Sequence, residues 1–336
     1  MAPKVVTVDQ LARAAAAAFG GGRTLSGLER LRGGTQKGVY RLTMDDASTA
    51  IAYLWEASEN YWPATPWDGN PADPFGPGSG FGLDMFEPAW KRLHTLGIPV
   101  PELYLADRDR EYYPADVAIV EDCPGENLME LLARDPQAAA APLRQLAEAL
   151  DEMRRYRAPA YGKVAHIDGG GTPSGTSCES TALEFGLRCL SDAAARDTRI
   201  AGARDRLEEK LHELAAPVRP RAEYSLVHGE LGLDHVMIAK DGRPVLVDLD
   251  NLLYFDVEWE HVFLRIRLHD DYRYLAVDGL DEDRLALYML IQRLSLTAGP
   301  LRLLESDFPN RAFMQSIAEH NGNAALAWVE GERTGS

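Results

Sequence analysis

The sequence predicts an α+β fold with two lobes: a small lobe built on an antiparallel β-sheet, followed by a larger, mainly helical lobe. Three short apolar segments, 25–31, 38–44 and 49–55, are separated by turn residues, which is the pattern of an antiparallel meander. From residue 127 onward apolar residues recur with helical periodicity. A chain of 336 residues with 46% hydrophobic residues is long enough for two lobes and a sizeable core.

The small lobe is expected to cover residues 1–122. A first helix over 8–19 begins after Thr7, a residue type that favours helix N-termini. A second helix is predicted over 83–96, with Pro88 in its first turn. Residues 56–84 are crowded with Pro, Gly and aromatic residues and have no period, which indicates a long loop that acts as a lid or as a dimer contact. Two further strands are predicted over 100–106 and 115–121.

The large lobe is expected to cover residues 123–336, with 123–126 as the connector. Two short strands joined by an Asp241-Gly242 turn interrupt its helices. A cleft between two such lobes is where ligands usually bind. The predicted helices span 128–134, 138–157, 182–196, 203–214, 257–268, 281–297 and 311–328.

The net charge of −17 repels nucleic acid and favours a cationic small-molecule partner, although an acidic surface that only maintains solubility explains it as well. Cys123, Cys178 and Cys189 lack metal-type spacing, so reduced thiols and a cytoplasmic protein are expected. The alanine run at 14–18 is too short and too closely flanked by charge for a signal peptide. No segment is long enough to span a bilayer, and both a monomer and a homodimer are compatible with the composition.

The most informative segment is 226–250. A short apolar strand leads into His228-Gly229-Glu230, His235 follows, and Asp248 ends a second apolar strand. One loop would thus supply the residue that faces an acceptor hydroxyl together with a metal ligand, and the next strand would supply another ligand. Phosphoryl transfer requires little more than an aligned hydroxyl and cations on the phosphate oxygens.

This segment resembles the aminoglycoside phosphotransferase and choline kinase superfamily, small-molecule kinases with a protein-kinase-like fold. The family's usual loop, His-Gly-Asp-Leu-x-x-x-Asn, corresponds to residues 228–235, and its Ile-Asp-Trp-Glu corresponds to 247–250. The resemblance extends over roughly residues 25–268. It implies ATP or GTP as donor, Mg²⁺ as cofactor, and transfer of the γ-phosphate to an alcohol group of a small molecule.

The resemblance also assigns roles. Glu230 takes the place of the aspartate that orients and deprotonates the acceptor hydroxyl, and its extra methylene requires the site to adjust. His228 orients the loop. Asp248 is the strongest metal ligand, while Asp250, one pleat period further on, is a second candidate. His235 replaces the usual asparagine, as in macrolide kinases, and either binds the metal or contacts phosphate.

The predicted nucleotide loop contains Gly33, Gly34 and Lys37; its glycines allow backbone N–H groups to approach phosphates. A plain hairpin turn would give the same pattern. The third strand has Tyr53 where the family has a lysine. We therefore expect Lys37, the one lysine of this loop, to supply the missing cation and to pair with Glu87.

The alternative for the nucleotide loop is an exposed Lys37, with Arg41 or a loop arginine carrying the charge. At the connector, the resemblance implies that backbone groups of Glu121 and Cys123 bind adenine. The Cys123 thiol itself is expected to be an unreactive gap-filler.

Acidic residues are the candidates for acceptor binding, with Asp234, Asp270 and Asp271 favoured. The acceptor class stays open between an antibiotic and a metabolite such as a sugar, an amino alcohol or a homoserine-like compound. An alternative function is a catalytically impaired pseudokinase, because the base, the asparagine and the lysine are all substituted. The further acidic candidates are Asp256, Glu258, Glu260 and Glu305, of which Glu260 matches a mostly structural family acid.

Overall fold

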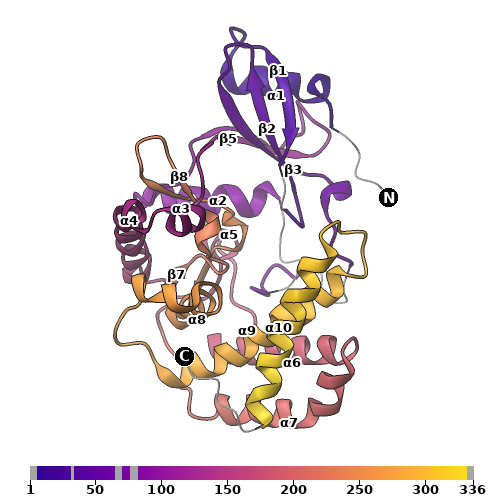
Figure 1. Ribbon diagram of the computed structural model, residues 1–336, viewed down its shortest axis with the longest axis vertical. Coiled ribbons are helices and arrows are strands. Elements are labelled where there is room, and N and C mark those ends of the chain that lie inside the picture. Colours follow the sequence, from indigo (N-terminus) through magenta and orange to yellow (C-terminus); the bar gives the residue numbers. More distant parts are fainter. Residues whose placement is uncertain (1–5, 32–33, 65–69, 76–81, 331–336) are drawn as a thin grey trace. The chain divides into compact units, whose positions relative to one another are not determined.

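The computed structural model describes residues 6–31, 34–64, 70–75 and 82–330. Its antiparallel sheet and its helical remainder confirm the predicted α+β class (Figure 1). Contacts group the chain into two compact units, each assembled from several stretches, so the predicted lobes 1–122 and 123–336 stay a prediction. The first unit contains 1–62, 80–145 and 234–250; the second contains 63–79, 146–233 and 251–336.

A five-stranded antiparallel sheet forms the centre of the first unit, in the order β1-β2-β3-β5-β4. The predicted meander is confirmed, with a shift of one residue at the end of its first strand. The strands are β1 (Leu25–Arg30), β2 (Gly38–Met44), β3 (Thr49–Trp55), β4 (Leu103–Asp107) and β5 (Asp116–Glu121).

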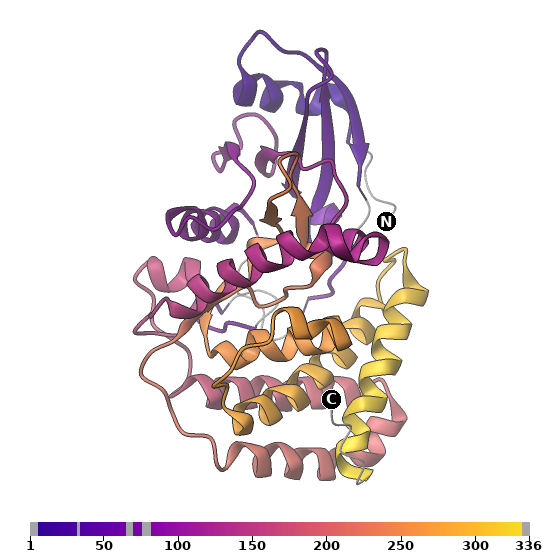
Figure 2. The ribbon, with the colours of Figure 1, turned by 60° about the vertical axis from the view of Figure 1, so that its left-hand side comes forward.

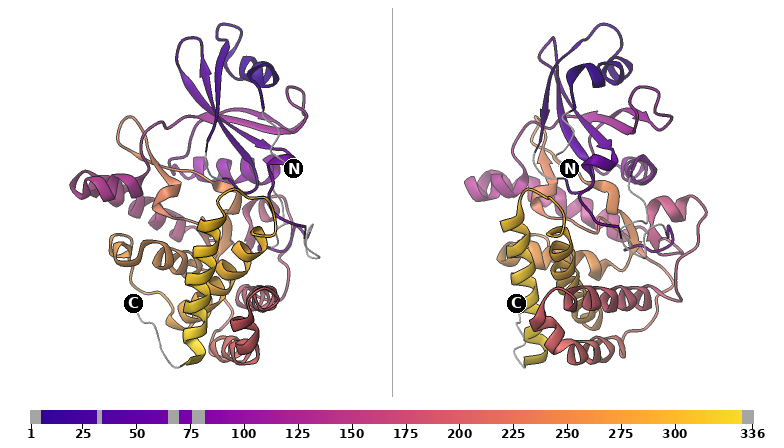
Figure 3. Two further views of the ribbon diagram at one scale, coloured as in Figure 1. Left: turned by 45° about the vertical axis from the view of Figure 1, so that its right-hand side comes forward. Right: turned by 90° about the vertical axis from the view of Figure 1, so that its right-hand side faces the viewer.

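Helix α1 (Val8–Phe19) covers this sheet (Figure 3). The N–H of Thr7 donates to Oε1 of Gln10 over 2.9 Å, which closes the first turn at the predicted N-terminus. Leu11 is fully buried and belongs to one cluster with strand residues such as Leu42. Burial of such side chains contributes ~1.5–3 kcal/mol each, so the sheet depends on this helix for its core.

The connector and a β-hairpin are held together in the first unit. The hairpin consists of β8 (Val236–Ile238) and β9 (Pro244–Leu246), and Gly242 at its turn has φ +84°. The N–H of Ile238 donates to Glu126 O over 3.2 Å. A Cβ on Gly125 would lie 2.8 Å from Ile238 O, so this close approach requires glycine. These contacts hold the hairpin next to the connector that follows β5.

The remaining helices of the first unit agree with the sequence in type. Helix α2 (Leu83–Thr95) begins at the predicted residue, but Pro88 lies in its second turn, one turn later than predicted. Helix α3 (Leu128–Arg134) is capped by the Asn127 side chain, which accepts from the N–H of Glu130.

Helix α4 (Pro136–Arg155) begins in the first unit and ends in the second (Figure 2). A three-stranded antiparallel sheet, β6-β10-β7, lies beyond it in the second unit. Helices α6, α7, α9 and α10 pack on one another there. The second-unit elements are β6 (Gly162–Lys163), α5 (Val164–Asp168), α6 (Cys178–Ala194), α7 (Thr198–Ala215), β7 (Ser225–Val227), β10 (Leu253–Phe255), α8 (Val257–Leu268), α9 (Glu282–Leu303) and α10 (Arg311–Glu330).

Part of the aromatic loop predicted at 56–84 packs within the second unit. In the second unit, Phe75 packs against Phe185 and Trp259, with ring centroids 4.6 Å away in each case. Asp73 is buried and pairs with Arg188 over 2.7 Å. This part of the loop packs against the second unit, while residues 65–69 and 76–81 lie outside the described residues, so the roles as a lid or as a dimer contact stay predictions. In the described part of the chain, no helix has the length and apolar character needed to cross a membrane.

Candidate active site

A buried lysine lies between two carboxylates in the first unit. Lys37, which directly precedes β2, is 6% exposed, and its Nζ lies 2.9 Å from Asp248 Oδ1 and in contact with Asp250 Oδ2. Burial alone lowers the pKa of Lys37, but the two carboxylates outweigh it and raise the pKa above its ordinary value. The lysine is therefore charged, and the alternative of an exposed Lys37 is wrong.

Lys37 also lies close to Tyr53, the β3 residue that stands where the resemblance leads one to expect a lysine. Its Nζ lies 4.9 Å from the centroid of the Tyr53 ring and 5.9 Å from that of Trp55, which are cation–π distances. Val39 and Tyr53 are register partners in the neighbouring strands β2 and β3. A lysine just before β2 can therefore reach the ring of Tyr53 on β3. The prediction that Lys37 compensates for Tyr53 agrees with this geometry.

The predicted pairing of Lys37 with Glu87 is wrong. Glu87 Oε2 instead binds Arg108 Nη2 over 2.8 Å, and both side chains are exposed. Arg41, the alternative cation, is held by Asp122, with Nε to Oδ2 at 2.7 Å. A lysine bound to two carboxylates has no electrostatic need for a third, which explains why Glu87 finds another partner.

Asp248 and Asp250 converge for a different reason from the one predicted. Strand β9 ends at Leu246, so the two acids are not on one face of a strand. Asp248 has φ +62°, a left-handed conformation that Asp tolerates better than most residues. Asp250 lies in the 3₁₀ turn Leu249–Asn251 that follows. The turn, rather than strand alternation, brings both carboxylates to Lys37.

His235 lies beside this pair. Its Nε2 is 3.8 Å from Asp248 Oδ2, and its carbonyl accepts from the N–H of Val247 over 3.0 Å. No group of three or more His, Cys, Asp or Glu side chains within 6–31, 34–64, 70–75 and 82–330 is arranged to hold a metal ion. Mg²⁺ usually binds one or two protein carboxylates and takes its other ligands from water and phosphate, so the two converging carboxylates fit this ion.

A buried glutamate holds the backbone of the predicted catalytic loop in the second unit. Glu260 Oε2 accepts from the N–H groups of His228 and, over 3.1 Å, Gly229. Burial raises the pKa of Glu260 to about 7. Gly229 has φ +89°, and a Cβ there would lie 2.8 Å from Asn251 O, so the loop requires glycine. The predicted structural role of Glu260 is confirmed.

This support leaves Glu230 at the surface. His228 is fully buried, as expected for an orienting residue, whereas the Glu230 side chain is exposed. Glu230 follows the fixed Gly229 directly, so its backbone position is restrained while its carboxylate reaches solvent. A general base requires this combination of restrained position and access to a ligand.

The nucleotide loop is tight and is tied to residues that the sequence did not single out. Gly34 has φ +69°, and a Cβ there would lie 2.5 Å from Lys37 O; Gly33 lies outside the described residues. Thr35 accepts from Trp62 Nε1 over 2.8 Å and, through its carbonyl, from the N–H of Tyr61 over 2.9 Å. The beginning of the aromatic loop therefore braces the glycine turn.

Glu59 is a second brace that sequence reasoning missed. It is 1% exposed and binds Arg30 Nη2 over 2.6 Å and the Tyr40 hydroxyl. A Cβ on Gly38 would lie 2.8 Å from its carboxyl carbon, so this glycine makes room for it. The sequence carries no signal for a buried Glu59, because it stands in an aperiodic polar stretch.

One backbone donor of the connector is already used within the protein. The N–H of Glu121 already donates to Glu102 O over 2.8 Å, which removes that donor from ligand contacts. Cys123 is buried, and burial raises the pKa of its thiol to about 11. The thiol is therefore protonated at neutral pH, in agreement with its predicted lack of reactivity.

The acidic candidates for acceptor binding divide into two groups. Asp270 is exposed and Asp271, half-buried, pairs with Arg273 over 3.3 Å, while Asp234 is half-buried in the 3₁₀ turn Leu233–His235. Asp256 and Glu258 are buried and bonded to arginines, so these two are framework residues. Glu305 binds Arg196 over 2.8 Å.

The sequence matches the phosphotransferase enzyme family over residues 85–288. The chain belongs to this family. The matched range includes the connector, the loop at 228–235 and the two acids bound to Lys37, so the two motifs that carried the predicted resemblance lie inside it, whereas the predicted nucleotide loop lies outside it. No curated protein matched the sequence.

Solved structures of this family share the fold. Aminoglycoside phosphotransferase APH(4)-Ia is 16% identical, with a TM-score of 0.58 over 95% of this chain and 99% of that one. Choline kinase LicA from Streptococcus pneumoniae is 11% identical, with a TM-score of 0.58 over 92% and 95%. Spectinomycin phosphotransferase APH(9)-Ia, solved with ADP and spectinomycin, is 11% identical, with a TM-score of 0.60 over 91% and 94%. These matches confirm the predicted protein-kinase-like α+β fold.

Proposed function

We propose that this phosphotransferase moves the γ-phosphate of ATP or GTP to a hydroxyl group of a small molecule. The observation that supports this most directly is the Lys37 ammonium held by Asp248 and Asp250 over the ring of Tyr53. A cation and two acids collected from distant parts of the chain are the electrostatic elements that phosphoryl transfer needs. Structures of family members with ADP, AMP-PNP, hygromycin B or spectinomycin are consistent with this reading.

In the proposed mechanism, Asp248 and Asp250 would hold Mg²⁺, with His235 beside them. When bound, Mg²⁺ supplies positive charge to the phosphate oxygens. Lys37 adds a fixed positive charge for the nucleotide, and backbone N–H groups near Gly34 face its phosphates. Glu230 accepts the hydroxyl proton of the acceptor as the oxygen attacks the γ-phosphorus, while the bond from that phosphorus to the β-phosphate oxygen breaks and ADP or GDP leaves.

The acceptor is proposed to be cationic and to contact Asp270, Asp271 or Asp234. A chain of net charge −17 attracts such a molecule over several ångströms, with a strength that salt reduces. Antibiotics with amino groups and amino alcohols both satisfy this chemistry. A screen for ATP consumption against aminoglycosides, macrolides and hydroxylated metabolites tests the proposal, with Asp248→Ala as the inactive control.

The role of Lys37 is tested by nucleotide binding. We expect Lys37→Met to weaken the affinity for MgATP at least tenfold, or ~1.4 kcal/mol, because it removes the buried cation. Lys91→Met is the matched control, since Lys91 is exposed on α2 and a charge of the same sign is lost. Equal affinities in the two variants would contradict the proposed role, whichever acceptor is used.

A pseudokinase is the second candidate, favoured by three substitutions: Glu230 at the base position, His235 for asparagine and Tyr53 for lysine. Such a protein would bind MgATP, with a rise in melting temperature, but would consume none with any acceptor. The proposed enzyme would instead show turnover that Asp248→Ala removes.

A further inference from the structure

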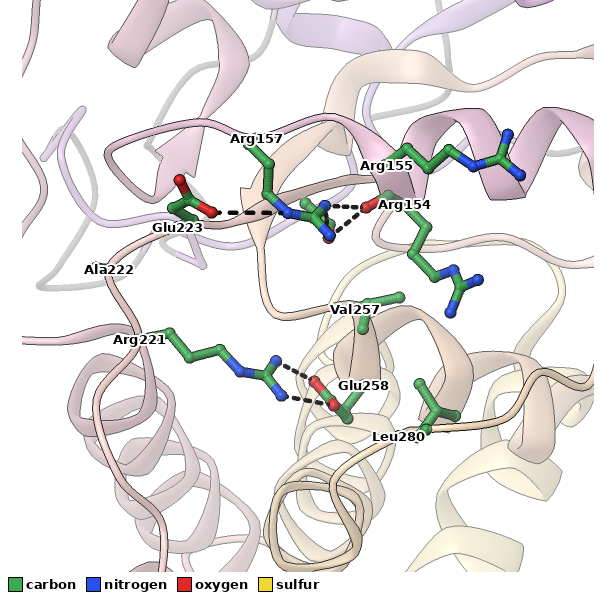
Figure 4. Close-up of a pocket in the computed structure, with 11 residues that line it drawn as sticks. Arg154, Arg155, Arg157, Arg221, Ala222, Glu223, Val257, Glu258 and Leu280 are labelled. Atoms are coloured by element: carbon green, nitrogen blue, oxygen red, sulfur yellow. Dashed lines mark hydrogen bonds and ion pairs between the residues drawn. The ribbon is translucent and has the colours of Figure 1, made fainter.

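An arginine-lined pocket of about 640 Å³ lies in the second unit (Figure 4). Four arginines and two glutamates, Glu223 and Glu258, are among the residues that line it. The Arg155 guanidinium turns away from the others and pairs with Asp151 and Glu152, so the open donors of the pocket come from Arg154 and Arg157. The four arginines, Arg154, Arg155, Arg157 and Arg221, come from the end of α4 and from the segment before β7.

Arg221 forms the fixed wall of the pocket. Its Nη1 and Nη2 bind the two oxygens of Glu258 over 2.6 and 2.9 Å, and Nη1 also lies 3.2 Å from Asp256 Oδ1. Glu258 is fully buried, so this fork is desolvated on one side. Because Arg221 neutralises Glu258, this carboxylate does not offset the positive charge of the other arginines in the pocket.

Arg157 is held in place mainly by neutral groups. Its Nη1 donates to Arg154 O and, over 2.9 Å, to Tyr156 O, and its Nε lies 3.8 Å from the exposed Glu223. Arg154 is oriented by Asp151, with Nη2 to Oδ1 at 2.8 Å. Within the described residues, neither Arg157 Nη2 nor Arg154 Nη1 makes a hydrogen bond. The pocket thus presents oriented donors that remain available.

The existing ion pairs are easily exchanged for a ligand. The Arg154, Arg155 and Arg157 side chains are 35%, 61% and 51% exposed. Exposed pairs of this kind contribute only ~0–1 kcal/mol, so a more highly charged anion can replace them at little cost. Guanidinium groups bind phosphate through two parallel hydrogen bonds, which makes phosphate the best-matched anion.

We propose that this pocket binds a small phosphate-bearing molecule. Its volume lies within the ~300–1,000 Å³ of ligand pockets and exceeds the size of a single phosphate group. The pocket also touches both elements that hold the catalytic loop: Ser225 begins the strand that leads to His228, and Glu258 lies on α8 with Glu260. A bound phosphate therefore restrains the loop through β7 and α8. This proposal does not depend on the proposed catalytic function.

Isothermal titration calorimetry of the full chain with inorganic pyrophosphate, in EDTA buffer, tests the site. We expect saturable binding by the wild type and at least tenfold weaker binding by Arg154→Gln/Arg157→Gln. The matched control is Arg144→Gln/Arg204→Gln, which removes two exposed arginines on α4 and α7 that do not line the pocket. The control should bind within twofold of the wild type.

Ribose 5-phosphate serves as a second probe, because it separates organic from inorganic phosphate as the source of the ligand. Loss of binding confined to the pocket variant supports the site with either probe. Absence of saturable binding by the wild type, or equal affinity in the two double variants, overturns it. The latter result would place pyrophosphate elsewhere on the protein.

Folding of the variants is checked separately. The circular dichroism spectrum and the melting temperature should be unchanged in both double variants, which shows that a lost pyrophosphate signal is not caused by unfolding. If the double glutamine variant melts at lower temperature, Arg157→Lys replaces it. This variant keeps the charge but not the planar fork, and about threefold weaker binding is expected. Unchanged pyrophosphate binding by Arg157→Lys would contradict the proposal.

Discussion

The two units each contain a buried ion cluster, and the clusters differ in how fully their charges are satisfied. In the first unit, one ammonium, that of Lys37, serves both Asp248 and Asp250. In the second unit, Asp256 accepts from Arg284 Nε over 2.9 Å and from the Tyr288 hydroxyl over 2.6 Å, with Arg221 3.2 Å away.

Burial and backbone conformation separate them further. Asp256 is 1% exposed, and each arginine of this cluster has two carboxylate partners: Asp256 and Glu258 for Arg221, and Asp256 and the half-buried Asp281 for Arg284. The Asp248 side chain is 40% exposed and its φ is +62°, a conformation maintained at a cost. A dry cluster with several cations suits a framework. A cluster with one cation for two carboxylates and an open side suits the binding of a further cation.

The largest expected effect breaks the first cluster. Asp248→Ala should lower phosphotransfer about a thousandfold, because metal-ion stabilisation of the transition state is worth several kcal/mol. Stability should fall by only ~1–2 kcal/mol: Lys37 keeps Asp250 as its partner, but alanine tolerates the positive φ of this position less well than aspartate. ATP consumption with a hit from the acceptor screen and thermal melting measure the two quantities. Asp278→Ala, at an exposed position, is the control, and equal activity of both variants would refute the assignment.

The next effect breaks the second cluster. Asp256→Ala should lower the free energy of unfolding by ~3 kcal/mol, because it removes the buried carboxylate shared by Arg284, Arg221 and Tyr288 and leaves Arg284, 3% exposed, with only the half-buried Asp281. Urea denaturation followed by circular dichroism measures it. An exposed ion-pair residue, Arg273→Ala, should cost less than ~1 kcal/mol. A loss for Asp256→Ala as small as that would remove the distinction between framework and reactive cluster.

A third effect concerns pH, through two neighbours on α8 with opposite shifts. Burial raises the pKa of Glu260 to about 7, so its folded form holds a proton that the unfolded chain releases; stability from this group is lost as pH rises from 4.5 to 7. Burial lowers the pKa of His261 to about 4, so stability from this group is lost as pH falls from 6.5 to 4. The two contributions oppose each other in the wild type.

Single variants separate these contributions. In Glu260→Gln, where His261 still titrates, the free energy of unfolding should rise by up to ~3 kcal/mol between pH 4 and 6.5. In His261→Gln, where Glu260 still titrates, it should fall by up to ~3 kcal/mol between pH 4.5 and 7. Urea denaturation at each pH checks both slopes. Parallel pH profiles in the two variants would show that neither group titrates differently in the folded and unfolded chain.

Local patterns predicted most of the fold. The meander at 25–55 and the helices at 8–19, 128–134 and 257–268 have bounds set by turn residues, caps and periodicity, which are properties of neighbouring residues. The sequence also led to the prediction that Lys37 substitutes for the strand lysine, because this chain lacks the lysine of the family pattern and its glycine loop contains one.

Long-range packing explains what the sequence did not predict. The partners of Lys37 and Glu87 depend on side chains that meet only after folding, and local spacing does not report them. The convergence of Asp248 and Asp250 depends on a left-handed residue followed by a 3₁₀ turn. The stretch that contains Phe75 was interpreted as a loop because it has no period, whereas Phe75 packs, half-buried, against Phe185 and Trp259 in the second unit.

The smallest expected effect concerns the nucleotide loop of the first unit. This loop is held by single hydrogen bonds and not by a cluster of ion pairs. Trp62→Phe removes the 2.8 Å bond from Trp62 Nε1 to Thr35 Oγ1. The expected loss of stability is ~1 kcal/mol. Thr35→Val removes the same bond from the other side while the Thr35 carbonyl still accepts from Tyr61. The double variant should therefore lose less than the two single losses combined, by ~0.5–1 kcal/mol. If the losses simply add, this bond does not couple the aromatic loop to the glycine turn, and the nucleotide loop depends on Glu59 and Gly38 instead.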